Sequence, residues 1–427
     1  MLTLNLTARS ASALEMKASV RYLACGMILL GIMQLVLRTS FSSFHSDFSH
    51  YYIGGSLFAA GDNPYTTHLE RLSDAYSVPY DPMIPYAAHP PLILLLFAQL
   101  SQFSMPIAYG IWLVFQLCCV GACVELTRRI LDFSWRDTCW LLLVAFFLNS
   151  IAVRQLIYFS QVQLAVGALA YAALYSNLRG RHCLACALIV VAAAFKIFPA
   201  VLLPWFLLAG VKTWRSIFAR LATMALVATL CLLLPGSQAW IDFLTLGLPS
   251  LTANAAIWTN YSIQNFVASM ARASFHLDSG HASEPVVAVL PKLGSLVVIA
   301  LAMLIVAIRR LPARESFCIL LMAATVGGFI AWTHYMTLML LPIALVVRHA
   351  VTHKSAASIR TAAIICFLVL MPHLDEIFVN RLGILRSASV VLHFYPLYSI
   401  GCLAILLIAQ GEYSRRKETS ESQLLAA

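Results

Sequence analysis

One short stretch of the sequence, HSDFSHYY at residues 45–52, combines an aspartate with two histidines and two tyrosines. Aromatic neighbours can strip water from a carboxylate and make it more basic, so Asp47 is a candidate general base. The spacing His45-x-Asp47-x-x-His50 also suits a divalent metal, although one local cluster is a small ligand set. A solvated loop aspartate is the third interpretation, and the stretch by itself leaves all three open.

Two further ionisable residues interrupt apolar runs, namely Lys196 in FKIFP and His334 in WTHYMTLMLLP. Ionisable residues within membrane-spanning segments are functional candidates by default. The alternatives are a lysine that snorkels to the interface and a histidine that belongs to an interfacial aromatic belt. The polar runs SQVQL at 160–164 and NYSIQN at 260–265 are further candidates near helix ends or loops.

The composition indicates that the chain is a membrane protein. Of the 427 residues, 61% are hydrophobic and only 11% are charged, whereas soluble domains carry about 25% charged residues. The net charge of +10 comes from short Lys/Arg clusters between apolar runs, which is positive-inside patterning and not a nucleic-acid-binding stripe. The eleven cysteines lie mostly within apolar runs, and none forms a paired CxxC zinc or redox pattern.

The alternation of apolar runs and basic clusters predicts one polytopic helical domain over residues 1–410, with both termini in the cytoplasm. Residues 39–104 form a long first outer loop, whose apolar part at 90–104 is short for a span and expected to be re-entrant or interfacial. The tail at 411–427 is polar and expected to be disordered. Twelve spans are expected, at about 20–38, 106–127, 137–153, 158–177, 183–195, 197–210, 216–235, 288–308, 316–333, 336–349, 361–376 and 388–410.

Two features of this topology concern chemistry. Short spans flank Lys196 and His334, and interrupted spans of this kind often border a cavity, although the pair around Lys196 could also be one long helix. The outer loops at 39–89, 236–287 and 377–387 are longer than the inner turns, so we expect the chemistry on the outer face.

Taken in order, these stretches resemble glycosyltransferase family 87, whose members are membrane enzymes of the GT-C superfamily that use polyprenyl-phosphate sugars, typically mannose. The resemblance spans about residues 40–345. Ser160 and Gln163 depart from the family's Gly-Gln-x-Asn element, and Tyr261 departs from an Asn-Gln-Ser-Leu-like element. The matching elements are DFSHYY at 47–52, GDNPY at 61–65, Tyr86 with Pro90-Pro91, SQVQ at 160–163, KIFP at 196–199, NYSI at 260–263 and WTHY at 332–335.

The resemblance implies a GT-C-type helical bundle with its catalytic carboxylate in the first outer loop. Asp47 is then the general base that takes a proton from the acceptor hydroxyl, in one inverting displacement that forms an α-linkage. The departing phosphate needs charge stabilisation, for which Lys196, His334 and Arg272 are candidates, while the tyrosines suit the sugar. The expected substrate-binding residues are Lys196, His334, Tyr51, Tyr52, Tyr65, Gln161, Asn260 and Arg272.

The implied partners are a polyprenyl-phosphate sugar, a glycolipid or glycan acceptor, and the bilayer of a bacterial plasma membrane, with the site on its extracytoplasmic face. No cofactor or nucleic acid is expected, a divalent metal is compatible with the sequence but not indicated by it, and no glycine-rich phosphate loop occurs on an inner segment. The alternative from another class is a secondary transporter or lipid-carrier flippase, which would need a repeated half and acids near the bilayer midplane. A non-catalytic scaffold of an envelope polymer machine is a third reading, in which Asp47 is dispensable.

Overall fold

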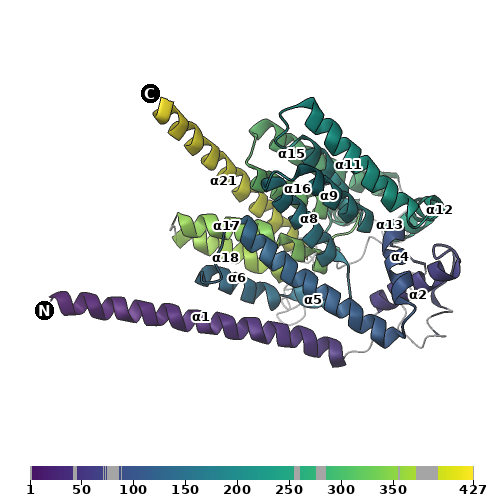
Figure 1. Ribbon diagram of the computed structural model, residues 1–427, viewed down its shortest axis with the longest axis horizontal. Coiled ribbons are helices and arrows are strands. Elements are labelled where there is room, and N and C mark those ends of the chain that lie inside the picture. Colours follow the sequence, from purple (N-terminus) through teal and green to yellow (C-terminus); the bar gives the residue numbers. More distant parts are fainter. Residues whose placement is uncertain are drawn as a thin grey trace.

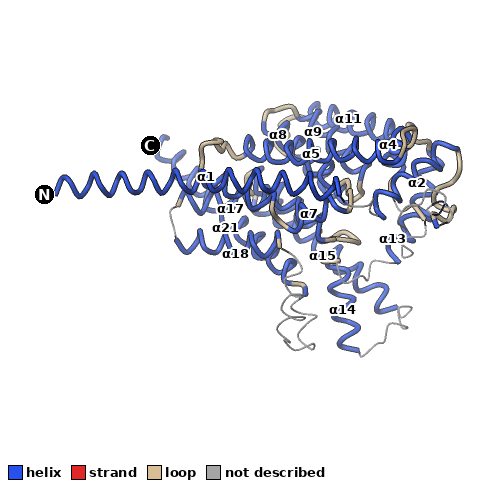
Figure 2. The backbone as a smooth tube through the Cα atoms, turned by 90° about the horizontal axis from the view of Figure 1, so that it is seen from below, coloured by secondary structure: helices blue, strands red, loops and turns tan. Residues whose placement is uncertain are grey.

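The computed structural model describes residues 2–41, 46–70, 72, 74, 86–87, 89–253, 260–275, 285–353, 356–371 and 393–426. Helices make up most of these residues, and the isolated β-bridge among them joins Asn260 to Trp332. The prediction of an all-α fold is therefore confirmed. Figures 1 and 2 show the helices gathered into one bundle, with α14 (Ile263–Phe275) projecting from its side.

Several of these helices can cross a membrane. Within the described residues six are long and apolar enough: Ala18–Leu37, Met105–Ile130, Trp214–Leu233, Val289–Arg309, Thr333–Thr352 and Tyr395–Arg416. Helices α6 (Thr138–Leu148) and α7 (Ile151–Tyr158), bent by 45° at their junction, form a seventh if they count as one span. The chain is thus a multi-pass membrane protein. The count of twelve stays a prediction, because several expected spans are helices shorter than the roughly 20 residues that a bilayer core requires.

The described part of each expected span nevertheless lies mostly on one helix or on two consecutive helices, whereas residues 372–376 and 388–392 of the last two spans, and the outer loop expected at 377–387, lie outside the described residues. The helices concerned are α1 (Leu2–Phe41), α5 (Met105–Ile130), α6 (Thr138–Leu148), α7 (Ile151–Tyr158), α8 (Gln163–Leu178), α9 (His182–Phe195), the 3-10 helix η1 (Phe198–Leu202), α10 (Leu203–Leu208), α11 (Trp214–Leu233), α15 (Pro285–Arg309), α16 (Ala313–Val326), the 3-10 helix η4 (Thr333–Met339), α17 (Leu340–Thr352), α18 (Ala356–Leu370) and α21 (Tyr395–Ala426). The expected break at Lys196 separates α9 from η1.

Short helices cover the end of the bundle that lies away from the two chain termini (Figure 1). They are α2 (Ser46–Ala60), α4 (Pro91–Leu100), α12 (Ser237–Asp242), the π-helix η2 (Phe243–Gly247) and α13 (Leu248–Ala253). Helix α4 has only 10 residues, as expected for a segment too short to cross, and it begins at a proline, which suits the first helical position. It packs directly on α2, because Gly54 and Gly55 of α2 let the two backbones approach.

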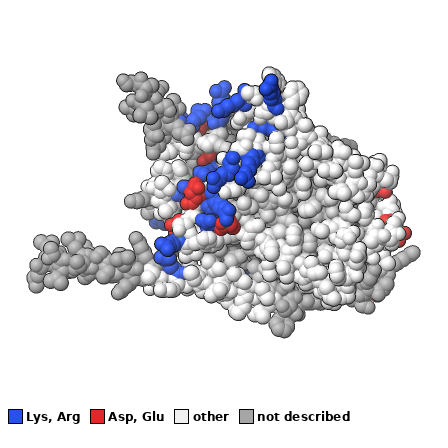
Figure 3. Space-filling view, viewed as in Figure 1, with Lys and Arg blue, Asp and Glu red and all other residues white. Residues whose placement is uncertain are grey.

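Basic side chains gather at the opposite end. Figure 3 shows Lys and Arg in a band on the side of the molecule from which both termini project. Such residues belong to the turns that join α5 to α6, α8 to α9, α10 to α11 and α15 to α16. This arrangement agrees with the positive-inside pattern and separates the basic turns from α2 and α4.

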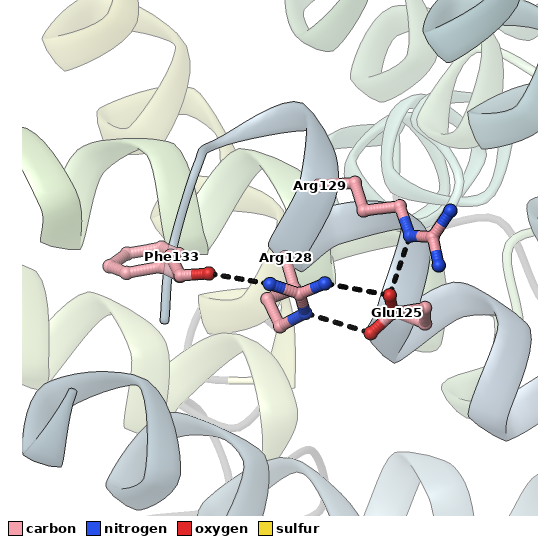
Figure 4. Close-up of polar contacts among 4 residues, drawn as sticks. All are labelled: Glu125, Arg128, Arg129 and Phe133. Carbon is pink, nitrogen blue, oxygen red and sulfur yellow. Dashed lines mark hydrogen bonds and ion pairs between the residues drawn. The ribbon is translucent and has the colours of Figure 1, made fainter. Parts of the chain in front are cut away.

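Ion pairs link the helix ends within this basic band. Glu125 of α5 accepts from Arg128 at 2.8 Å and from Arg129 at 2.6 Å, and Arg128 also donates to the Phe133 carbonyl at 2.9 Å (Figure 4). Asp132 pairs with Arg314 of α16 at 3.1 Å. Exposed pairs of this kind contribute little to stability, because water and salt screen them, so they mainly set local geometry.

The tail differs from the expectation of disorder, because α21 runs on to Ala426. Glu412 pairs with Arg309 at 2.7 Å, and Arg415 donates to the Arg309 carbonyl at 2.9 Å, so the first turns beyond residue 411 are tied to the end of α15. The segment after Gly411 contains no proline or further glycine, and its Glu, Arg, Leu and Ala residues favour helix.

Candidate functional site

A cavity of about 270 Å³ lies beside α2, between segments that are far apart in the sequence. Its polar lining side chains are Asp47, His50, His89, Gln161, Lys196 and Tyr335. The rest of the wall is mainly apolar and comes from η1, η2, α15, α16 and the turn at 327–330. Among these lining residues Asp47 supplies the carboxylate and Lys196 the ammonium group. Asp47, predicted from the sequence to take a proton, and Lys196, predicted to stabilise an anionic phosphate, therefore face one cavity.

Asp47 lies in the first turn of α2, where the helix dipole favours a negative charge. His50 and Tyr51 follow it by three and four residues, so the three side chains share one face of the helix. Asp47 is only 8% exposed, which excludes the solvated loop aspartate. Tyr52 points elsewhere, because its hydroxyl donates to the Phe103 carbonyl at 2.7 Å, beyond the end of α4.

Gln161 connects α2 to the segment that precedes α8. Its Nε2 donates to Asp47 Oδ2 at 2.5 Å, and its Oε1 accepts from the Tyr51 hydroxyl at 3.1 Å. Burial, reinforced by the Asp47 charge, holds the pKa of Tyr51 well above its usual value, so this hydroxyl keeps its proton and acts as the donor. The Tyr51 ring stacks on His89 at 4.0 Å between ring centroids and on Phe97 at 5.0 Å.

The backbone next to Gln161 has an unusual conformation. Ser160 has φ of +55°, a left-handed conformation that glycine adopts without strain, so the position suits the glycine that the resemblance implies. Two side chains of α5 hold this turn. Trp112 Nε1 donates to the Ser160 carbonyl at 2.9 Å, and Gln116 Nε2 donates to the Gln161 carbonyl at 2.9 Å.

Lys196 follows the last residue of α9 and has extended backbone, with φ of −151° and ψ of 136°. Its Nζ donates to the Tyr335 hydroxyl at 3.0 Å and lies 4.7 Å from the centroid of that ring. Burial lowers the pKa of Lys196 to about 7, and the Asp47 charge opposes this shift. The ammonium group is thus held at the cavity by an aromatic ring.

His334 is buried but does not line the cavity, whereas its neighbour Tyr335 does. The reason is the 3-10 geometry of η4, whose three residues per turn put Trp332 and Tyr335 on one face and turn residue 334 away. The His334 ring packs instead near Phe159, Trp332 and Tyr335, at centroid distances of 6.2, 5.6 and 5.2 Å.

Three other predicted residues, Tyr51, Tyr65 and Asn260, also lie outside the cavity lining. Tyr65 donates to the His89 carbonyl at 2.9 Å and packs against Phe243, so it supports two residues of the wall. Asn260 Oδ1 accepts from the Ala331 backbone N–H at 2.8 Å, which ties its segment to the turn before η4. Arg272 belongs to α14, but its side chain lies outside the described residues.

Sequence reasoning did not select His89 or Tyr335, although each lies within or beside a quoted motif, and it considered His50 only as a metal ligand. The helical spacing from Asp47 was the available signal for His50. The metal interpretation of the histidines gains no support, because the described part of the chain contains no group of three or more side chains able to hold a metal ion, and His45 lies outside it.

The described helices thus form a multi-pass membrane protein in which a carboxylate and an ammonium group face a largely apolar cavity. The model of glycosyltransferase family 87 matches residues 87–333, which are 247 of the 427 residues. The chain belongs to this family, the resemblance is confirmed, and the protein is a glycosyltransferase. The matched segment includes Gln161 and Lys196, whereas Asp47 precedes it. No curated protein matches the chain.

Proposed function

We propose that this glycosyltransferase moves a sugar, mannose in the first instance, from a polyprenyl phosphate to a hydroxyl of an envelope glycolipid or glycan. The observation that carries the proposal is the division of the cavity into a polar part with Asp47 and Lys196 and a wall that is mainly apolar. A sugar phosphate is polar and anionic, whereas a polyprenyl chain is wholly apolar. The two parts of the cavity match the two parts of this donor.

In the proposed reaction, Asp47 takes the proton from the acceptor hydroxyl as its oxygen attacks the anomeric carbon. The bond from that carbon to the phosphate oxygen breaks, and polyprenyl phosphate leaves with the bonding electrons. The transition state is oxocarbenium-like, as in glycoside hydrolysis. Attack from the face opposite the phosphate inverts the centre, so a β-linked donor gives an α-linkage.

We propose that Lys196 stabilises the negative charge on the departing phosphate. Its ammonium group and the Tyr335 hydroxyl are held 3.0 Å apart, so both are available to one phosphate oxygen without rearrangement. Because phosphate leaves as an anion, this charge stabilisation replaces a general acid. The pair therefore complements Asp47, which acts on the other side of the sugar.

The outer face of the plasma membrane is the side that we propose for the reaction. The basic turns gather at the terminal end of the bundle, and cytoplasmic turns are the ones enriched in Lys and Arg. Helices α2 and α4, which flank the cavity, lie at the other end (Figure 1). A lipid-linked donor reaches such a site through the bilayer and needs no cytoplasmic nucleotide sugar.

The test compares wild type with Asp47→Asn, using polyprenyl-phosphate mannose and a panel of glycolipid and glycan acceptors in proteoliposomes. Transfer by the variant should fall by about 10²- to 10⁴-fold, the usual contribution of a general base. Asp62→Asn is the matched control, because Asp62 is an exposed carboxylate in the same loop. Equal transfer by wild type and Asp47→Asn would refute the role of the base. Uptake of the lipid or sugar without transfer would instead favour a transporter.

A further inference from the structure

Gln161 was expected to bind substrate, yet its side-chain hydrogen bonds go to other protein residues. Its Nε2 donates to Asp47 and its Oε1 accepts from Tyr51, and both partners belong to α2. The side chain is only 2% exposed. An amide that spans residues i and i+4 of one helix fixes the rotation of that helix face as well as the side chains themselves.

The direction of these bonds is determined by Tyr51. Its phenol stays protonated and donates to Oε1, which leaves Nε2 to face Asp47 Oδ2. The reversed amide would bring its oxygen against a carboxylate, which is repulsive while that carboxylate is ionised. The amide therefore favours the charged, proton-accepting form of Asp47 and holds its plane relative to the cavity.

The main chain of Gln161 is equally constrained. Its carbonyl accepts from Gln116 of α5 at 2.9 Å, and its N–H donates to the Leu156 carbonyl at 3.1 Å. The preceding Ser160 carbonyl accepts from Trp112 of α5 at 2.9 Å. Because the turn is anchored to a 26-residue membrane helix, the amide is positioned independently of α2.

From this geometry we infer that Gln161 is a positioning residue, which aligns the Asp47 carboxylate toward the acceptor hydroxyl and keeps it ionised. The inference rests on the proposed function, because that function makes Asp47 the general base. It differs from a role in donor binding, because loss of Gln161 then acts on the chemical step and its pH dependence and leaves the affinity for the lipid donor nearly unchanged.

The test measures kcat, the KM for polyprenyl-phosphate mannose and the pH profile of wild type and Gln161→Met. We expect kcat to fall about 10- to 100-fold, as for misplacement of a catalytic group by a fraction of an ångström to 1 Å. The acid limb should move to higher pH by about one unit, because a carboxylate that loses a hydrogen-bond donor holds its proton more strongly. The other titratable groups at the cavity are His50 of α2, His89, Lys196 and Tyr335.

Two more variants guard against misfolding and against a merely structural effect. Tyr51→Phe removes only the hydroxyl that orients the amide and should lower kcat and move the acid limb in the same direction by a smaller amount. Gln410→Met is the matched control, since Gln410 is a buried glutamine of α21, far along the chain and outside the cavity lining, and it should keep both the wild-type kcat and the pH profile.

The outcomes separate the two ideas. If Asp47→Asn is inactive while Gln161→Met and Tyr51→Phe raise only the KM for the donor, the positioning role is wrong and the proposed function stands. The same holds if both variants retain the wild-type kcat and pH profile. If Asp47→Asn transfers sugar at the wild-type rate, the proposed base itself fails.

Discussion

The close packing of α2 on α4 predicts that one methyl group can misalign the base. A Cβ added at Gly55 would lie 2.5 Å from the Phe97 carbonyl carbon and 2.7 Å from the Ala98 nitrogen. Both are backbone atoms of a helix and cannot rotate away. Ordinary van der Waals contact begins at 3.4 Å, so Gly55→Ala must move α2 and α4 apart by about 0.9 Å, the difference between 3.4 and 2.5 Å.

The consequences for stability and for activity differ in size. Overpacking of this kind costs about 1–3 kcal/mol, and alanine regains about 1 kcal/mol over glycine within a helix. The net loss of roughly 0–2 kcal/mol leaves the protein folded. Asp47 lies on the same helix eight residues earlier, so a shift of α2 is transmitted to its carboxylate. A 1 Å misplacement at a catalytic centre costs about 100-fold in rate.

The assay records the transfer rate and the thermal unfolding of purified wild type, Gly55→Ala and a control, Gly121→Ala. No atom lies within 4 Å of a Cβ built at Gly121, so alanine there should raise the melting temperature slightly and leave transfer unchanged. Gly55→Ala should lose most of its transfer with a small fall in melting temperature. Wild-type transfer by Gly55→Ala would refute the claim that this contact aligns Asp47.

Two further predictions concern Lys196 and Ser160. Because burial lowers the pKa of Lys196 to about 7, the protonated form is lost as pH rises, so kcat/KM of wild type should fall above about pH 7. Lys196→Arg should keep activity at higher pH, since guanidinium stays charged, and a flat wild-type profile would contradict the role of this cation. Ser160→Gly should change stability by less than about 1 kcal/mol, because the relief of a left-handed residue offsets the greater chain entropy of glycine. Ser160→Val should lose about 1–2 kcal/mol by thermal unfolding, and equal melting temperatures of the two variants would contradict the strain.

Much of the architecture could be predicted because membrane helices correspond to long apolar runs in the sequence. The sequence offered two interpretations around Lys196, two short spans or one long helix, and the structure has the break, with Pro199 in the 3-10 helix that follows. Asp47 could be selected because its motif follows the first span, and its burial agrees with a catalytic place. The number of membrane crossings could not be fixed, because helices of 10–15 residues satisfy neither the criterion for a span nor that for a loop.

Side-chain directions within the site were beyond the sequence for a physical reason. Whether residue 334 or residue 335 faces the cavity depends on a 3-10 turn, whose period of three replaces the usual 3.6. The role of Gln161 depends on a partner 114 residues away. Asn260 was a reasonable candidate by type, yet its amide completes the backbone hydrogen bonds of the turn before η4.

The polar end of the cavity is closed by two long-range contacts, from Gln161 to Asp47 and from Lys196 to Tyr335, which span 114 and 139 residues. During synthesis, Asp47 is therefore made long before the residue that orients it, and Lys196 long before its aromatic support. The segment that matches the family, residues 87–333, contains neither contact in full, because Asp47 precedes it and Tyr335 follows it. Under the proposed function, sugar transfer therefore reports on complete membrane insertion, and a chain arrested before residue 335 would lack the contact between Lys196 and Tyr335.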